Sequence, residues 1–141
     1  MRRKILEKEL QKSITLIEEN LPGTYEQFQE LPQIVKDGIY KRVEQAIEVI
    51  YDIMAEIIRE KDLEIPSDDY SIPEILRRAG ILTDAEEKTL KAMRGFRNIL
   101  VHVYEDLDEE LAYETIKEGI KDLKRFQEKF RIMTEGSKGK R

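Results

Sequence analysis

VEQAIEVIYDIMAEII, residues 43–58, is the stretch that decides the fold. Its apolar side chains recur every three or four residues, which is the spacing of one face of an α-helix. The main face holds Val43, Ala46, Ile47, Ile50, Met54, Ile57 and Ile58. Ile39, Val49 and Ile53 widen this face beyond a single stripe. We therefore expect a helix from Pro32 to Lys61 that is buried on two sides.

The segments on either side show the same helical spacing. An apolar stripe predicts a helix from Met1 to Glu19, which Leu21-Pro22-Gly23 ends. A connector with Tyr25 and Phe28 follows, and residues 63–70 form a second, polar connector.

Capping signals mark the later helices. Ser71 with Glu74 has the spacing of a capping box and predicts a short helix that ends at Gly80. Thr83 or Asp84 caps the next helix, whose apolar residues are Leu90, Met93, Phe96, Leu100 and Val101. Asp106 or Asp108 caps the last, whose apolar positions from Leu111 onward run to about Met133.

Composition agrees with one helical domain. The 141 residues are 40% apolar and 39% charged, which is typical of a helix-rich chain with a charged surface. We predict an all-α, antiparallel bundle of four to five helices over residues 1–133, followed by a disordered basic tail over residues 134–141. No apolar run approaches the ~20 residues that cross a bilayer, and the basic N-terminus lacks the apolar core of a signal peptide. We expect a cytoplasmic protein with no membrane association.

Composition also excludes several kinds of site. The chain has no cysteine and a single histidine, so thiolate chemistry and a multi-histidine metal site within one protomer are excluded. The net charge of −5 argues against broad, nonspecific coating of nucleic acid, but it leaves room for a small basic site.

The chemistry concentrates in RNILVHVY, residues 97–104, which contains the only histidine. At ~100° per residue, Arg97 and Tyr104 fall on nearly the same helix face, whereas His102 lies ~140° from Arg97 and lines up with Asn98. Arg97 and His102 therefore need a helix end near residues 100–102, or a second subunit, to act together. Asn98 can orient the imidazole by a hydrogen bond.

These residue types suit metal-independent cleavage of RNA. A histidine can take the proton of the ribose 2′-hydroxyl as it attacks phosphorus, and an arginine can hold the charge that builds on the phosphoryl oxygens. The leaving 5′-oxygen needs a second proton-transfer group. One histidine cannot be acid and base in the same step, so this mechanism requires a homodimer that brings two copies of His102 to one cleft.

The same residues also have purely structural interpretations. A lone histidine near a helix end is more often structural, and Tyr104 can simply pack at a dimer interface. Arg97 can pair with the acidic run at residues 105–108. Arg94 fits a surface or phosphate-positioning role better than a catalytic one.

The motif resembles that of a known family. Arg97-Asn98, three residues, and His102-Val103-Tyr104 match the Arg-x4-His-x-Tyr motif of HEPN-domain proteins. The HepT-like toxins, which pair with MntA-type minimal nucleotidyltransferase antitoxins, are the most similar group. The helical context agrees over roughly residues 1–132, including the segment Ile72-Pro73-Glu74-Ile75-Leu76.

The resemblance implies a HEPN-like homodimer with facing motifs. It implies the toxin of a type VII-like toxin–antitoxin pair, an endoribonuclease in which Arg97 and His102 cleave RNA and Asn98 supports them. Tyr104 matches the tyrosine to which the nucleotidyltransferase partner transfers AMP to silence the toxin. The ATP and magnesium of that transfer belong to the partner, so we expect no cofactor and no metal in this chain.

Two other functions compete with the enzyme. The chain can be a non-catalytic helical module that binds a nucleotidyltransferase or a nucleotide, which its overall acidity favours. It can also be a purely structural oligomeriser, in which case replacing Arg97 and His102 would alter only stability.

Overall fold

The computed structural model describes the backbone of residues 2–102 and 107–139 and the side chains of residues 2–101 and 107–133. Within these residues all regular structure is helical, which confirms the prediction of an all-α fold. The helices are α1 (Arg2–Asn20), α2 (Tyr25–Gln29), α3 (Gln33–Glu60), α4 (Ser71–Arg78), α5 (Asp84–His102) and α6 (Glu109–Gly139). The sequence analysis treated α2 as part of a connector. It begins because the Thr24 side chain accepts a hydrogen bond from the Gln27 backbone N–H.

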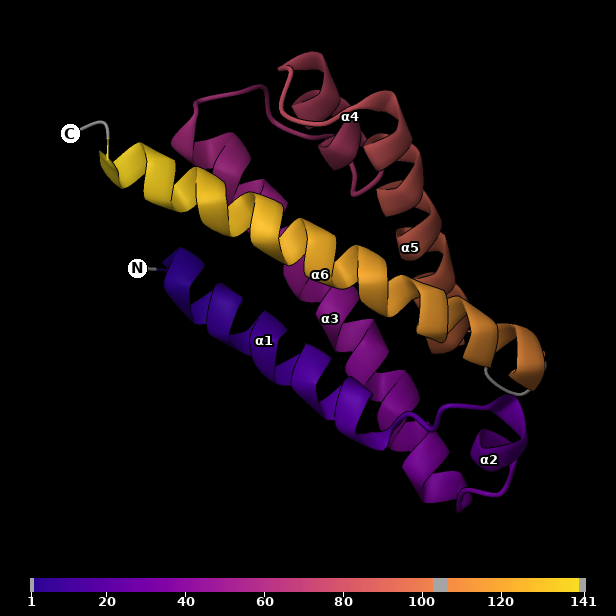
Figure 1. The fold of residues 1–141 in the computed structure, drawn as a ribbon. Coiled ribbons are helices and arrows are strands. Elements are labelled where there is room, and N and C mark those ends of the chain that lie inside the picture. The colour runs from indigo at the N-terminus through magenta and orange to yellow at the C-terminus, as the bar shows by residue number, and fades with distance from the viewer. Residues whose placement is uncertain (1, 103–106, 140–141) are drawn as a thin grey trace.

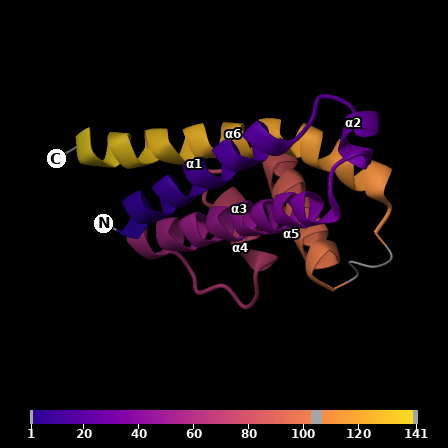
Figure 2. The same ribbon diagram turned by 90° about the horizontal axis from the view of Figure 1, so that it is seen from below.

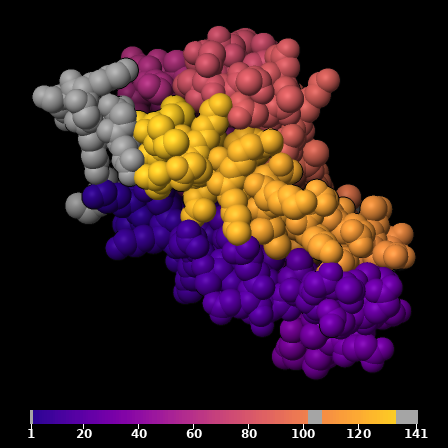
Figure 3. All heavy atoms as spheres, in the orientation of Figure 1, coloured from indigo at the N-terminus to yellow at the C-terminus, as the bar shows by residue number. Residues whose placement is uncertain are grey.

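α3 lies at the centre of the bundle (Figure 1). It contacts α1, α4, α5 and α6, so the expected burial on two sides is confirmed. α1 and α6 lie beside each other on one side of α3, while α5 and α4 pack on another (Figure 2). In the space-filling view, α6 runs across the face between α1 and the region of α4 and α5 (Figure 3).

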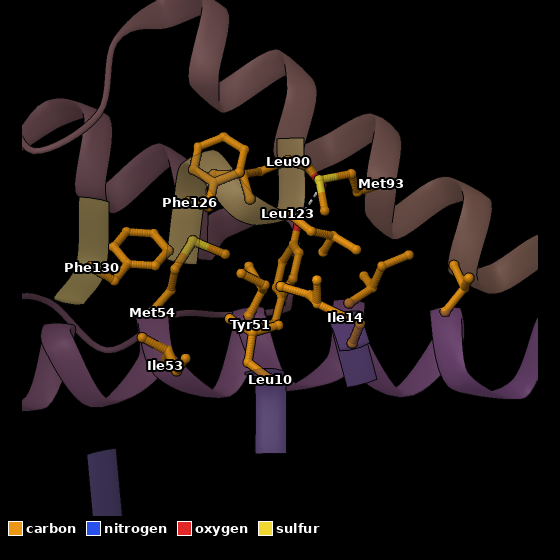
Figure 4. Packing of buried hydrophobic residues seen from close by; sticks show 14 of the residues in the cluster. Leu10, Ile14, Tyr51, Ile53, Met54, Leu90, Met93, Leu123, Phe126 and Phe130 are labelled. Atoms are coloured by element: carbon orange, nitrogen blue, oxygen red, sulfur yellow. Dashed lines mark hydrogen bonds between the residues drawn. The ribbon is translucent and has the colours of Figure 1, made fainter. Parts of the chain in front are cut away.

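The core consists of the apolar faces that the sequence predicts. Side chains from α1, α3, α5 and α6 meet in one cluster, part of which is shown in Figure 4: Leu10, Ile14, Tyr51, Ile53, Met54, Leu90, Met93, Leu123, Phe126 and Phe130. Full burial of a large apolar side chain contributes about 1.5–3 kcal/mol, so this cluster dominates the stability of the bundle. Tyr51 crosses the core, and its hydroxyl donates to the Leu90 carbonyl over 2.7 Å.

A buried cation joins three helices at one end of the bundle. The guanidinium of Arg3 donates to the Phe130 carbonyl over 2.9 Å and pairs with Glu60 at 3.1 Å. These contacts connect the first turn of α1 to the last turn of α3 and to α6, and they satisfy part of the hydrogen-bonding demand of a buried charge.

Two of the predicted caps are present. Thr83 and Glu86 form a capping box at the start of α5, with Glu86 N–H to Thr83 Oγ1 at 3.1 Å and Thr83 N–H to Glu86 Oε1 at 2.8 Å. Asp108 caps α6 by accepting from the Leu111 N–H over 3.1 Å. Gly80 ends the α4 region with a φ of 80°, a conformation that glycine adopts without strain. The alternative cap Asp106 lies outside the described residues.

The capping box predicted for Ser71 is wrong. Ser71 is the first helical residue, and the cap position belongs to Tyr70, which makes no side-chain cap bond. The Ser71 hydroxyl instead accepts from the N–H groups of Ser67 and Asp68, because it closes the preceding turn. Glu74 pairs with Lys91 at 2.6 Å rather than with the helix end.

Val101 and Leu111 were expected on apolar faces and are exposed instead. Val101 follows the buried Leu100 and Leu111 precedes the buried Ala112, and the rotation of ~100° between neighbours turns each of them away from the buried face of its helix. α6 continues to Gly139, beyond the expected end near Met133, because helical backbone does not require a buried face. The division into a domain over residues 1–133 and a disordered tail stays a prediction.

No helix within the described residues is long and apolar enough to cross a membrane.

Candidate functional site

The last turns of α5 carry the described part of the motif. The Thr83 cap and the acidic first turn fix the start of α5. Leu90, Met93 and Leu100 then hold it against the core. This packing places Arg97 and Asn98 toward the C-terminal end of the helix, and His102 is the last residue of α5.

Arg97 is held from two directions. Its side chain is 21% exposed, and its Nη2 forms an ion pair with Glu48 Oε2 on α3 at 3.2 Å. Its Nη1 donates to Asn98 Oδ1 over 3.4 Å. Its Nε is buried and has no hydrogen-bond partner among the described residues. The carboxylate that meets Arg97 therefore comes from α3, whereas the sequence suggested the acidic run at residues 105–108, of which 105 and 106 lie outside the described part.

Asn98 is a bridge rather than an isolated amide. Its Nδ2 donates to the hydroxyl of Tyr70 over 3.2 Å, while its Oδ1 accepts from Arg97. Tyr70 lies at the end of the connector between α3 and α4, so this connector supports the motif. The predicted supporting role of Asn98 thus has a structural partner, and a second amide N–H stays available for a further contact.

Arg94 is a structural residue. Its side chain is only 11% exposed and pairs with both Glu48, at 3.0 Å, and Asp69. Its guanidinium also lies 5.6 Å from the centre of the Tyr51 ring, within the range of a cation–π contact. The expected surface position of Arg94 is therefore wrong, whereas a phosphate-positioning role stays a prediction.

The acidic residues around the two arginines shape the local electrostatics. Glu48 and Asp69 balance the charges of Arg94 and Arg97. Burial raises the pKa of the nearby Asp52 carboxyl, and the charge of Glu48 raises it further. The described part of the site is thus close to neutral, and Arg97 is its partly exposed cation.

Of His102 and Tyr104, the structure describes only the backbone of His102. The described part of α5 reaches His102 and the next four residues are not described, so the expected helix end near residues 100–102 stays a prediction. The side chain of His102 and the whole of Tyr104 lie outside the described residues. The two routes by which Arg97 and His102 can meet, a turn at the helix end or a second subunit, therefore both stay open.

Sequence reasoning missed Glu48, Asp69 and Tyr70. All three lie far from the motif along the chain and reach it only through the packing of α3 and of its connector against α5. No local spacing signal could have identified them.

A separate cleft lies between α5 and α6. It has a volume of about 300 Å³ and is lined mainly by apolar side chains, including Met93, Phe96 and Ile116, with Val43 and Ile47 of α3. None of the motif residues that the structure describes lines it, and its walls suit packing better than proton transfer. We place the candidate site at Arg97 and the end of α5 for this reason.

Comparisons with known proteins agree with the family resemblance and with the fold. Residues 10–130 match the family model described as "Ribonuclease HepT-like". A provisionally named RNase of Archaeoglobus fulgidus is 31% identical over 105 residues, which are 71% of this chain and 79% of the relative. An mRNA nuclease HepT of Shewanella oneidensis is 26% identical over 92 residues, which are 65% of this chain and 69% of the relative.

Solved structures show the same fold. The tri-AMPylated HEPN toxin of Shewanella oneidensis, in complex with an MNT antitoxin, superposes with a TM-score of 0.82 at 22% identity, over 92% of this chain and 96% of the toxin. The bundle is therefore HEPN-like, as the sequence resemblance implied.

Proposed function

This chain belongs to the HepT-like ribonuclease family, and on that premise we propose that it is a metal-independent RNA endonuclease toxin that acts as a homodimer. The observation that supports this most directly is Arg97. It is a partly exposed arginine, braced by α3, in the helix that His102 ends.

In the proposed reaction each residue has one role. One His102 takes the proton of the 2′-hydroxyl as its oxygen attacks phosphorus, which yields a 2′,3′-cyclic phosphate. Arg97 binds the phosphoryl oxygens as their charge grows, because its donors match their geometry. The second His102 gives a proton to the leaving 5′-oxygen. Asn98 supports Arg97 through their shared hydrogen bond.

A homodimer accounts for two features together. The chain has one histidine, so acid and base must come from two copies. Ile99 and Val101, at the same end of α5, are 44% and 38% exposed. Apolar side chains in this position favour contact with another protein surface, and a second copy seated there would bring the two motifs together.

The decisive experiment measures RNA cleavage by the isolated, AMP-free protein in the presence of EDTA. Arg97→Ala and His102→Ala are each expected to lower the rate by about a hundredfold or more, with the dimer intact in sedimentation. Arg78→Ala is the matched control, because Arg78 is an exposed arginine that pairs with Glu64 away from the motif. Activity that disappears in EDTA and returns with magnesium would contradict metal independence.

We also propose that Tyr104 is the regulatory residue. A nucleotidyltransferase partner of the MntA type would transfer AMP from ATP to the Tyr104 hydroxyl and release pyrophosphate. The added anionic nucleotide would lie two residues from His102 and repel RNA phosphates. Incubation with the partner, ATP and magnesium should add the mass of AMP to the wild type and to Tyr70→Phe, but Tyr104→Phe should resist the first transfer.

The alternative is a non-catalytic module that binds the nucleotidyltransferase or a nucleotide. The pairing of Arg94 and Arg97 with Glu48 and Asp69 favours it, since little basic surface is left for RNA. The non-catalytic module would be the better account if the AMP-free wild-type dimer binds the partner but cleaves no RNA.

A further inference from the structure

Glu48 occupies a special place between the two arginines of α5. Its Oε2 meets Arg94 Nη1 at 3.0 Å and Arg97 Nη2 at 3.2 Å, so a single carboxylate oxygen serves both. Glu48 stands on α3 beside Ile47, which is buried in the core, and this packing fixes its backbone. The carboxylate is therefore presented by a rigid part of the fold.

Arg94 keeps that carboxylate in place. It is nearly buried, pairs with Asp69 and lies over the Tyr51 ring. Because its own position is fixed in this way, its bond to Glu48 limits how far the carboxylate can turn. Arg97 thus pairs with a carboxylate whose charge is already compensated by another cation.

Arg97 retains donors for a ligand despite these contacts. Each of its two terminal amino groups carries two hydrogens and has one protein partner: Nη1 donates to Asn98, and Nη2 forms an ion pair with Glu48. One hydrogen on each amino group is left, and a phosphate can accept both. The buried Nε shows that the inner edge of the guanidinium faces the protein.

We propose that Glu48 is a positioning residue for RNA cleavage, which orients the Arg97 guanidinium so that its outer edge meets the scissile phosphate. This inference rests on the proposed ribonuclease function. Glu48 would not touch the RNA, and it would act only through Arg97. A competing role is that of a mask. Glu48 would then pair with Arg97 in the free protein, and the RNA phosphate would have to displace Glu48 before it could bind Arg97.

Steady-state cleavage of a defined RNA distinguishes these roles. If Glu48 positions Arg97, Glu48→Ala lowers kcat by about ten- to a hundredfold, the range expected for a misplaced catalytic group. KM stays unchanged or falls, because a negative charge near the phosphate is gone. Glu48→Gln keeps an acceptor and should restore most of kcat. A rise in kcat/KM for Glu48→Ala would overturn the proposal in favour of the mask.

The matched control is Glu44→Ala. Glu44 lies one turn earlier on α3 and pairs with Lys41 of the same helix at 3.2 Å, so its removal changes the net charge equally and leaves the Arg94–Glu48–Arg97 contacts in place. Its kcat should match that of the wild type. Thermal unfolding of all three variants identifies any loss of fold, and Glu48→Gln keeps the test valid if Glu48→Ala is unstable.

A second measurement is independent of activity. The Arg97 Nε–H proton is buried, so its NMR signal, assigned by its loss in Arg97→Lys, should exchange slowly with water in the wild type and in Glu48→Gln. It should exchange rapidly in Glu48→Ala. Slow exchange in all variants would overturn the positioning role even if RNA is cleaved. If the exchange rate of the Arg97 Nε–H depends on Glu48 but the protein cleaves no RNA, Glu48 does position Arg97 and the ribonuclease proposal is wrong.

Discussion

Asn98 donates a hydrogen bond through its side-chain amide to the hydroxyl of Tyr70 over 3.2 Å, and this bond joins α5 to the connector before α4. Because the same amide accepts from Arg97, Tyr70 influences the arginine through Asn98. The connector thus takes part in the site although it carries no residue of the motif.

Tyr70→Phe should lower the rate of RNA cleavage by about two- to tenfold, which corresponds to the loss of one ordinary hydrogen bond. Global stability should change little, since Tyr70 is exposed. A double-mutant cycle with Asn98→Ala checks whether Tyr70 influences Arg97 through Asn98. If Tyr70 acts through Asn98, the double variant is no slower than Asn98→Ala alone, whereas additive losses would contradict this connection.

Arg94→Ala should destabilise the fold by about 1–3 kcal/mol, a value between those of exposed and fully buried ion pairs. The reason is that Glu48 and Asp69 lose a shared and nearly buried partner. Urea denaturation measures the change. The control is Arg125→Ala, an exposed arginine paired with Asp122, which should cost less than about 0.5 kcal/mol. Equal losses for the two variants would argue against a structural role for Arg94.

Glu87 should contribute stability only above acidic pH. Hydrogen bonds from Lys91 and Arg77 hold the pKa of Glu87 below its ordinary value of 4.5. The folded state therefore favours the ionised form, and its contribution is present above pH 4.5 and lost as the pH falls through the lower folded pKa. Glu87→Gln should be less stable than the wild type at pH 7, by up to about 1 kcal/mol, with the difference shrinking in acid. Chemical denaturation at pH 7 and pH 3 tests this, and a constant difference would refute it.

Asp52 should behave in the opposite way. Burial and the neighbouring Glu48 raise the pKa of Asp52 above its ordinary value of 3.8, while Arg2 opposes them. Ionisation is then less favourable in the folded state, so stability falls as the pH rises from 3.8 through the folded pKa. Asp52→Asn should raise the melting temperature at pH 7 and give no gain below pH 3.8. A lower melting temperature at pH 7 would show that the carboxylate is stabilising instead.

The helices were predictable because their signals are local. The apolar spacing in residues 43–58 specifies a long helix buried on two sides, and the structure has one. The starts of the helices were harder to predict, because Ser71 and Thr83 present the same capping pattern. Only Thr83 forms the box, since the turn before α4 uses the Ser71 hydroxyl for its own N–H groups. Competition between neighbouring backbone groups is not visible in spacing alone.

The site was predictable only in its local part. Arg97 and Asn98 belong to one contiguous motif, but α3 carries Glu44, Glu48, Asp52 and Glu56 at every fourth position. The spacing does not say which of these carboxylates faces α5. That choice depends on the angle and register at which the two helices pack, which arise from the whole core.

The contact of Arg3 with the Phe130 carbonyl has a practical consequence for handling this protein. It keeps the beginning of α1 beside the later turns of α6, so both chain ends leave the bundle opposite the junction of α5 and α6 (Figures 1 and 2). A fluorophore, an affinity tag or a surface attachment at either end would then lie away from the C-terminal end of α5. Immobilised protein should bind RNA and a partner as readily as untethered protein.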